Sequence, residues 1–256
     1  MPEFTSHEPG TFCWVELATN DVGAAKKFYM DLFGWGVNEL SMGPDGNYYI
    51  FTKNGKDCAA MYQLTPEMAG MPPNWMSYVS VTNADAVAEQ IKSLGGNVVK
   101  APFDVMDQGR MAVIADPQGA YFCIWQPKQG IGVHVRDEPD TLCWNELQAR
   151  DVDAAKKFYS GLGWGMKESP EYTEWKVGEK AIGGMMQSQA PPQVPSYWMP
   201  YFAVADCDAS VAKAKSGGAN VFAGPMDYPG VGRFAVLGDA QGAVFAVIKL
   251  ELGPHA

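Results

Sequence analysis

The two halves of this chain are an internal sequence repeat. Residues Cys13–Tyr29 read CWVELATNDVGAAKKFY and residues Cys143–Tyr159 read CWNELQARDVDAAKKFY, with 12 of 17 paired positions identical. A later pair of segments, Gly109–Ala120 and Gly232–Ala243, matches without a gap. Because chance does not produce agreement over such lengths, the chain contains one unit twice.

The spacing between matched residues shows where the two copies differ in length. The offset, which is the difference in residue number between a residue and its counterpart in the second copy, is 130 at Trp14. It falls to 124 at Met61 and 123 at Met76, and is still 123 at Gly119. Loops tolerate changes of length that packed elements do not, so the deletions are expected in loops of a duplicated domain. We therefore predict two domains, residues 8–129 and 137–252, each long enough to bury its own core.

Each copy is predicted to contain the element order β-α-β-β-β twice. In the first copy a strand over 12–18 precedes a helix that Asp21 caps and Gly34 ends, because Val22, Ala25 and Phe28 recur at helical spacing. Further strands are expected at 35–40, 48–53 and 58–64, and the pattern restarts with a strand at 75–81, a helix at 84–94 and strands near 98–100, 111–115 and 121–126. This order indicates an α+β fold of four modules with helices on one face of mixed sheets.

Composition limits the class of partner. The net charge is −10 and the pI about 4.7, which argues against a nucleic-acid backbone or an anionic membrane as partner. Residues 1–10 are polar and no apolar stretch reaches membrane-spanning length, so neither a signal peptide nor a membrane span is expected. The five cysteines lack metal-type C-x-x-C spacing and are expected to be reduced core residues. The prediction is a cytoplasmic protein.

The first strand separates its side chains by alternation. Cys13, Val15 and Leu17 are predicted to face the helix, while Trp14 and Glu16 face the other side. The second copy repeats this pattern, with Asn145 in place of Val15 as a polar exception on the helix side.

With these motifs the sequence resembles a known superfamily. The sequence resembles the vicinal oxygen chelate superfamily in five motifs. These are the helix D-x-x-A-A-x-x-F-Y, the L-F-G-W segment at its end, a late D-P-x-G turn, and the repeated C-W-x-E-L and G-R-x-A-V. That group includes glyoxalase I, extradiol dioxygenases and bleomycin resistance proteins, and its two-domain, glyoxalase-like or hydroxylase-like bacterial members are the narrower resemblance. The resemblance spans roughly residues 11–250 and implies tandem domains whose four βαβββ modules form cupped sheets with helices outside.

The resemblance also implies where a metal would be held. Four ligand positions on the cupped sheet usually carry His, Gln or Glu in the family's enzymes. In this sequence they fall at Trp14, Ala60, Met76 and Cys123 in the first copy, and at Trp144, Gly184, Met199 and Ala246 in the second. These side chains do not supply the donors that Mg, Mn, Fe, Ni or Zn require, so no metal and no cofactor are expected. His7, His134 and His255 lie near the termini or the inter-domain connection and are expected to be solvated.

Without a metal, the cupped faces are predicted to bind a ligand through large, soft side chains. The candidate ligand-binding residues are Trp14, Glu16, Met76, Tyr78, Arg110, Cys123 and Trp125, with Trp144, Glu146, Met199, Tyr201 and Arg233 in the second copy. Two alternatives stay open. The aromatic and methionine residues could be core where two sheets meet, and Glu16 and Glu146 could pair with Arg110 and Arg233.

The predicted function is metal-independent binding or sequestration of a small apolar or aromatic molecule. The alternative is a glyoxalase-like lyase or isomerase, or a hydroxylase-type enzyme, with Glu16 and Glu146 as catalytic bases, either with or without an unforeseen metal site. A third possibility is a purely structural interaction protein. The expected partner is a small molecule, not nucleic acid or membrane, and the chain either pairs its own two copies as a monomer or forms a homodimer.

Overall fold

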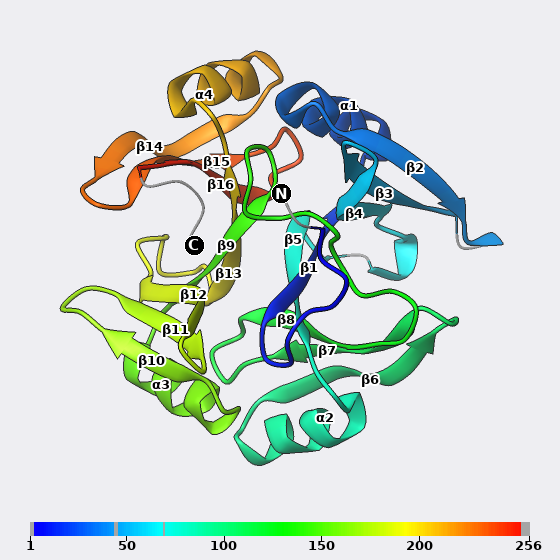
Figure 1. The fold of residues 1–256 in the computed structure, drawn as a ribbon, viewed down its shortest axis with the longest axis vertical. Coiled ribbons are helices and arrows are strands. Elements are labelled where there is room, and N and C mark those ends of the chain that lie inside the picture. Colours follow the sequence, from blue (N-terminus) through cyan, green and yellow to red (C-terminus); the bar gives the residue numbers. More distant parts are fainter. Residues whose placement is uncertain (1–2, 44–45, 69, 252–256) are drawn as a thin grey trace.

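In the computed structural model, which describes residues 3–43, 46–68 and 70–251, each copy forms one eight-stranded sheet (Figure 1). The first copy contains β1 (Phe12–Thr19), α1 (Val22–Phe33), β2 (Gly36–Ser41), β3 (Asn47–Lys53), β4 (Lys56–Gln63), the 3-10 helix η2 (Pro66–Met68), β5 (Asn74–Ser80), α2 (Ala84–Ser93), β6 (Asn97–Val105), β7 (Gly109–Ala115) and β8 (Tyr121–Pro127). The second copy contains β9 (Leu142–Ala149), α3 (Val152–Gly161), β10 (Gly165–Glu168), β11 (Thr173–Val177), β12 (Lys180–Gln187), β13 (Tyr197–Ala203), α4 (Cys207–Ser216), β14 (Asn220–Tyr228), β15 (Gly232–Gly238) and β16 (Val244–Leu250).

The strand orders are β2-β3-β4-β1-β5-β8-β7-β6 and β10-β11-β12-β9-β13-β16-β15-β14. In the first sheet β1 is parallel to β4 and antiparallel to β5, so two βαβββ modules join side by side at their first strands. The predicted α+β fold of four modules in mixed sheets is confirmed. The strand expected near residues 98–100 is longer than predicted, because β6 continues through two register shifts around Pro102, which has no amide hydrogen to donate.

The helix boundaries follow their capping residues. The Asp21 carboxylate accepts a hydrogen bond from the Ala24 amide at 2.9 Å, and Gly34 ends α1 in the left-handed region at φ +67°. Asp151 caps α3 in the same way, accepting from Ala154 N at 3.0 Å. The capping predicted from the repeated D-V-x-A-A sequence is therefore confirmed.

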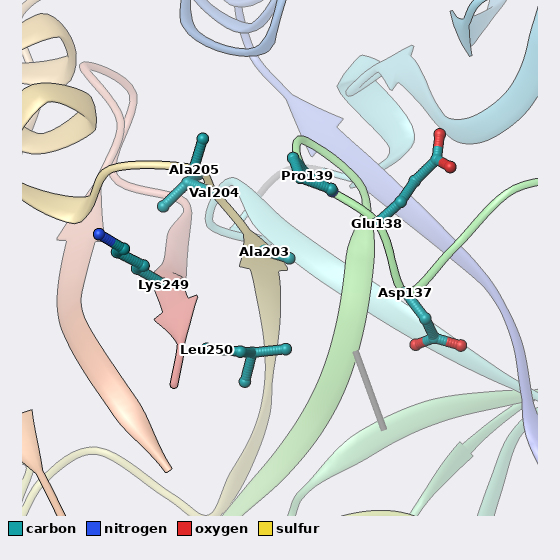
Figure 2. A pocket seen from close by; sticks show the side chains of 8 residues that line it. All are labelled: Asp137, Glu138, Pro139, Ala203, Val204, Ala205, Lys249 and Leu250. Atoms are coloured by element: carbon teal, nitrogen blue, oxygen red, sulfur yellow. The ribbon is translucent and has the colours of Figure 1, made fainter. Parts of the chain in front are cut away.

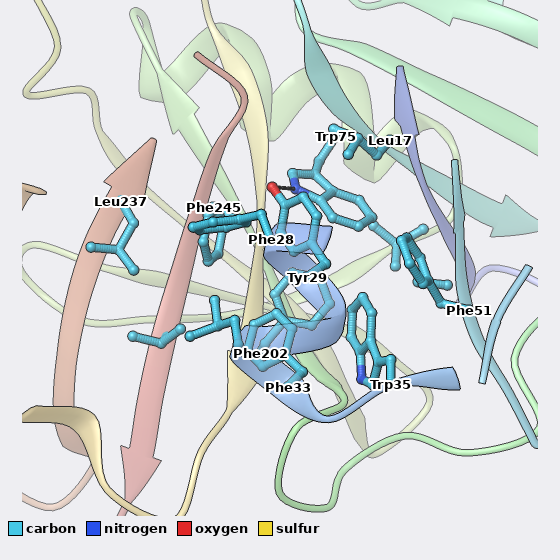
Figure 3. Close-up of a cluster of buried hydrophobic side chains, with 14 of the residues drawn as sticks. Leu17, Phe28, Tyr29, Phe33, Trp35, Phe51, Trp75, Phe202, Leu237 and Phe245 are labelled. Atoms are coloured by element: carbon cyan, nitrogen blue, oxygen red, sulfur yellow. Dashed lines mark hydrogen bonds between the residues drawn. The ribbon is translucent and has the colours of Figure 1, made fainter. Parts of the chain in front are cut away.

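The four helices lie on the convex faces of the sheets, so that α1 is next to α4 and α2 is next to α3 (Figure 1). Each large core is consequently built from both copies. One core is built mainly from α1, β1–β4, α4 and β13–β16, with Trp75 of β5 and Leu142 of β9. The other is built mainly from α2, β5–β8, α3 and β9–β12, with Phe12 of β1 and Trp198 of β13. Figure 3 shows this mixing, with Phe28 and Tyr29 of α1 against Phe202 and Phe245 of the second copy.

A buried hydrogen-bonded unit links the copies twice. Tyr29 of α1 donates to Asp239 Oδ2 at 2.9 Å and accepts from Trp75 Nε1 at 3.0 Å, the second bond being drawn in Figure 3. The matched unit in the other core joins Tyr159 to Asp116 at 3.0 Å and Trp198 to Tyr159 at 2.9 Å. In both units an aspartate at the start of the late turn of one copy binds the helix of the other.

One predicted side-chain orientation is wrong. Cys13 lies with Trp14 on the concave side of the sheet, not beneath the helix with Val15. The reason is a bulge between Phe12 and Trp14, which adds one residue to β1 opposite β5. The Cys13 carbonyl accepts a hydrogen bond from the Val133 amide at 2.8 Å, so the bulge also anchors the connection between the domains.

His7 is not solvated as predicted. Its Nε2 atom lies 2.8 Å from the Val133 carbonyl oxygen and its ring stacks on Phe4, and burial lowers the pKa of His7 to about 4. His134 Nδ1 lies 3.5 Å from Asp57, and His255 lies outside the described residues. Among the described helices, none has the length and apolar character needed to cross a bilayer.

Candidate functional site: two cups

The concave face of each sheet carries the side chains predicted to share one surface. In the first sheet these are Trp14, Glu16, Met76, Tyr78, Cys123 and Trp125, here called the first cup. The matched residues of the second sheet, Trp144, Glu146, Met199, Tyr201, Ala246 and Ile248, form the second cup. The predicted co-location of these residues is confirmed; a role in binding remains a prediction.

Strand register places each glutamate at the centre of its cup. Glu16 lies between Ala60 on β4 and Met76 on β5. Two residues earlier on β1, Trp14 lies opposite Tyr78 of β5, which in turn pairs with Cys123 of β8. Each carboxyl group is therefore surrounded by sheet and aromatic side chains, and water reaches only a small part of it.

The Glu16 carboxyl group is held by two phenols. Tyr48 donates to Oε2 at 2.5 Å and Tyr78 donates to Oε1 at 2.9 Å, while Trp14 Nε1 donates to the Tyr48 oxygen at 3.2 Å. Glu16 is only 8% exposed, and this burial raises its pKa although the two phenols favour the charged form.

The second cup repeats this arrangement with one more donor. Glu146 Oε1 accepts from Tyr201 at 2.8 Å and from Gln148 Nε2 at 2.6 Å, and the carboxyl group also accepts from Tyr172. Trp144 Nε1 donates to the Tyr172 oxygen at 2.9 Å. Burial again raises the pKa of the glutamate.

Tyr48 and Tyr172 are functional candidates that the sequence reasoning missed. They occupy matched positions at the offset of 124 residues that also relates Met61 to Met185, so the repeat could have identified them. In the second cup Gly184 makes room for the phenol, because a Cβ atom there would lie 1.9 Å from the Tyr172 hydroxyl oxygen. A phenol from the third strand of the module is thus built into both cups.

The alternative in which the glutamates pair with Arg110 and Arg233 is wrong. Arg110 binds Asp85 of α2 through two hydrogen bonds of 2.7 and 2.8 Å and lies 3.5 Å from Asp104. Arg233 binds Asp208 and Asp227 in the same manner. Strand alternation is the reason, because Met111 faces the first cup and its neighbour Arg110 therefore faces the helices. Both arginines lie on the convex side, away from the ligand-binding set in which they were predicted.

Two buried thiols, Cys13 and Cys123, lie on the concave side of the first sheet. All five cysteines of the chain are buried and unpaired. Burial raises the pKa of the Cys13 thiol to about 12, and it raises the pKa of Cys123 further, with the nearby Glu16 adding to the effect. Because the thiolate is the nucleophile and the metal ligand, neither side chain is suited to those roles.

The donor set of the cups does not fit a divalent metal. The positions that the resemblance assigned to ligands hold tryptophan, alanine, glycine, methionine and one neutral thiol, and each cup offers a single carboxyl group already bonded to phenols. Across residues 3–43, 46–68 and 70–251, no three His, Cys, Asp or Glu side chains gather as a metal site would require.

Two shallow crevices adjoin the ends of the second cup. One has a volume of about 190 Å³ and lies between the inter-domain connection at Asp137–Pro139 and the strand ends at Ala203 and Leu250 (Figure 2). The other, of about 270 Å³, lies beside Tyr172 and Met186. Neither contains Glu146 or Trp144, so these crevices do not include the polar centre of the cup.

Known structures share this architecture. The Mn(II)-bound glyoxalase from Novosphingobium aromaticivorans superposes with a TM-score of 0.66 at 15% identity, covering 94% of this chain and 82% of that one. The 2,3-dioxygenase LapB from Pseudomonas sp. KL28 gives a TM-score of 0.65 at 13% identity, with 97% and 96% covered. At such identities the likeness concerns the fold.

Sequence relatives extend over almost the whole chain. The "Putative glyoxylase CFP32" of Mycobacterium tuberculosis is 43% identical over 257 residues, covering 97% of this chain and 98% of the relative. The "Anthracycline biosynthesis protein DnrV" of Streptomyces peucetius is 36% identical over 267 residues, covering 97% and 96%. The model of the Glyoxalase/Bleomycin resistance protein/Dioxygenase superfamily matches twice, over residues 11–124 and 132–247. With two consecutive domains of this type and full-length relatives, the chain belongs to that superfamily.

Proposed function

We propose that this protein binds a small, flat, largely apolar molecule in a cup, without a metal, and thereby sequesters or carries it. The observation that carries the proposal is the buried Glu16 held by phenols beside the half-buried Trp14, which stands at a position that the resemblance assigned to a metal ligand. A surface of this kind offers ring faces for stacking and one polar anchor that fixes orientation.

The chemistry of the cup favours a ligand with few charges. In the first cup Trp14, Met76 and Trp125 are half-buried and present ring and thioether surface. Thioethers adapt to irregular shapes, and aromatic rings bury large areas at low entropic cost. Glu16 with a raised pKa is a hydrogen-bonding partner for a ligand hydroxyl or N–H group rather than an ion-pairing site.

The names of two relatives are in keeping with such a ligand. DnrV and DauV, 36% and 35% identical to this chain, are named for anthracycline biosynthesis, and anthracyclines are flat polycyclic aromatic compounds. This supports the proposed ligand class and identifies no compound for the present chain.

The proposal is tested by differential scanning fluorimetry and equilibrium dialysis with naphthols, hydroxyanthraquinones and aliphatic compounds of equal size. Aromatic compounds at a hundred times their dissociation constant should stabilise the protein by about 2.7 kcal/mol, and the aliphatic set should not. Elemental analysis of the same sample, purified without chelators, should give less than one divalent ion per ten chains. Absence of any aromatic binder, or stoichiometric metal required for binding, would overturn the proposal.

A second candidate function is acid–base catalysis, favoured by the raised pKa of Glu16 beside two phenols. A buried carboxylate can remove a proton from the carbon next to a carbonyl group and return it to the neighbouring carbon, as a glyoxalase-like isomerase requires. The name of CFP32 agrees with this chemistry. Turnover of the hemithioacetal of methylglyoxal and glutathione that is abolished by Glu16→Gln and Glu146→Gln together would establish the enzyme and displace the binding role.

A further inference from the structure

The two cups are not equivalent at the glutamate. In the second cup Gln148 donates a third hydrogen bond to the carboxyl group, at 2.6 Å to Glu146 Oε1. The matched residue of the first copy is Ala18, which has no donor. A protonated carboxyl group whose two oxygens each accept from one phenol still has a free lone pair on its carbonyl oxygen, so Glu16 retains acceptor capacity of the kind that Gln148 uses in the second cup.

A second phenol lies on the same face of the sheet. Tyr62 on β4 pairs with Ala18, next along the concave face from the pair of Ala60 with Glu16, so Tyr62 and Glu16 are diagonal neighbours. Burial raises the pKa of Tyr62, and the charge of Glu16 adds to the effect. Among the described residues the half-buried Tyr62 hydroxyl has no hydrogen-bond partner. Glu16 as acceptor and Tyr62 as donor together form a pair suited to one ligand hydroxyl group, which can donate to the first and accept from the second.

The floor of the first cup is also more open. Met76 and Trp125 are half-buried, whereas the matched Met199 and Ile248 are 2% and 5% exposed. In the second cup Tyr197 lies near Glu146 much as Tyr62 lies near Glu16, yet the carboxyl group there already has three donors. The crevices beside the second cup do not reach its glutamate.

The loops at one end of the first cup carry exposed apolar side chains that the matched loops of the second copy lack. β2 and β4 run in the same direction as β1, so their C-terminal ends lie at the end of the cup where Ala18 and Tyr62 lie. Leu40, Met42, Met68 and Met71, on or next to the connections that follow, are 37–45% exposed. Residues 165–199 span the shortened matched region, and no leucine, methionine or aromatic residue is exposed there.

We propose that the first cup alone binds the ligand, and that the ligand is a flat aromatic molecule bearing a hydroxyl group that bridges Glu16 and Tyr62 beneath the methionine-rich loops. Methionine surfaces adapt to apolar ligands of varied shape, which suits the edge of such a site. The second cup completes the fold, and its Gln148 occupies the place of the ligand hydroxyl. This inference rests on the proposed binding function and assigns it to one site.

Isothermal titration calorimetry with 2-naphthol and with 2-methylnaphthalene, which has nearly the same shape and no hydroxyl group, tests the assignment. The full chain should bind one equivalent of 2-naphthol, and 2-methylnaphthalene should bind roughly tenfold more weakly. Tyr62→Phe should weaken 2-naphthol binding by about tenfold and leave 2-methylnaphthalene binding unchanged. The control Tyr197→Phe, at a phenol beside the glutamate of the second cup but not at the repeat-equivalent position, should change neither.

A second pair of variants keeps the test decisive if one protein is unstable. Ala18→Gln copies the second-cup amide into the first cup and should weaken 2-naphthol binding by roughly tenfold or more, whereas Gln148→Ala should not weaken it. Two equal sites per chain, or losses confined to Tyr197→Phe, would overturn the one-cup assignment while the binding function stands. A chain that binds neither compound and no other aromatic compound would overturn both.

Discussion

The interface between the two halves and the two cups differ in how closely the copies match. At the interface the phenol–aspartate distances are 2.9 and 3.0 Å and the indole–phenol distances are 3.0 and 2.9 Å, with the same residue types in both units. In the cups, Cys123 is matched by Ala246 and Trp125 by Ile248. The interface units are buried in cores that both copies build, so each change there has to be accommodated by both copies. The half-buried cups are free of that constraint.

The largest loss of stability is expected from removal of a carboxyl group at the interface between the halves. Asp239 is fully buried and accepts from Tyr29 and from the amides of Gln241 and Ala243. Asp239→Ala leaves these donors without a partner and should lower the free energy of unfolding by about 3 kcal/mol, measured by urea denaturation. Asp116→Ala should cost nearly the same, because it removes the matched unit.

The control is Asp153→Ala, whose side chain is 96% exposed and whose loss should change stability by less than about 0.5 kcal/mol. Since both cores contain residues of both copies, each interface variant should unfold in a single transition. Unequal losses in the two matched variants, or a separate transition for one half, would contradict the view that the interface is one symmetric unit.

A smaller effect is expected where the interface itself departs from the repeat. Ser77 Oγ donates to Asn145 Oδ1 at 2.6 Å between the sheets, and Asn145 Nδ2 has no hydrogen-bond partner among the described residues. Ser77→Ala should destabilise by about 1–2 kcal/mol, because it leaves the amide oxygen unsatisfied as well. The double variant Ser77→Ala with Asn145→Val, which restores the residue found at position 15, should recover most of this loss in urea denaturation.

Double-mutant analysis decides whether the pair acts as a unit. A coupling energy of about 1 kcal/mol between the two substitutions is expected for groups in direct contact. Additive losses would show that Asn145 contributes independently of Ser77. The presence of Asn145 where the first copy has Val15 would then need another explanation.

Most of the fold could be predicted from the sequence because the repeat supplied each element twice. The caps Asp21 and Asp151, the module order and the concave set around Glu16 all depend on local patterns: a side chain that binds its own helix, or alternation along one strand. Where alternation was interrupted by the bulge at Cys13, the prediction was wrong, because a bulge is set by pairing with another strand.

The partners of Glu16 could not be predicted in the same way. The sequence identified the repeated glutamate and the repeated arginine, but Arg110 faces the helix and Tyr48 comes from a strand two positions away in the sheet. Which residue of β3 lies near β1 depends on the register through β4. Such non-local contacts leave no periodic signal in a single sequence, although the matched Tyr172 would have pointed to Tyr48.

The smallest expected effect concerns pH and compares the glutamates of the two cups. Burial raises the folded-state pKa of Glu16 and Glu146 above the ordinary value of 4.5, so the native protein holds these protons more tightly than the unfolded chain. The stability they contribute is complete below pH 4.5 and is lost as the pH rises through the folded-state pKa. The difference in unfolding free energy between wild type and Glu16→Gln should therefore shift toward the variant by roughly 1 kcal/mol between pH 4.5 and 8.

Glu146→Gln should show the same sign with a smaller shift, because Gln148 favours the charged carboxylate. His7, whose pKa is lowered to about 4, acts in the opposite direction below pH 6.5 but is present in every variant and cancels in the difference. Urea denaturation of wild type and both variants at five pH values measures this. A difference that grows in favour of wild type as the pH rises would mean that the phenols outweigh burial, and the neutral anchor proposed for the first cup would be wrong.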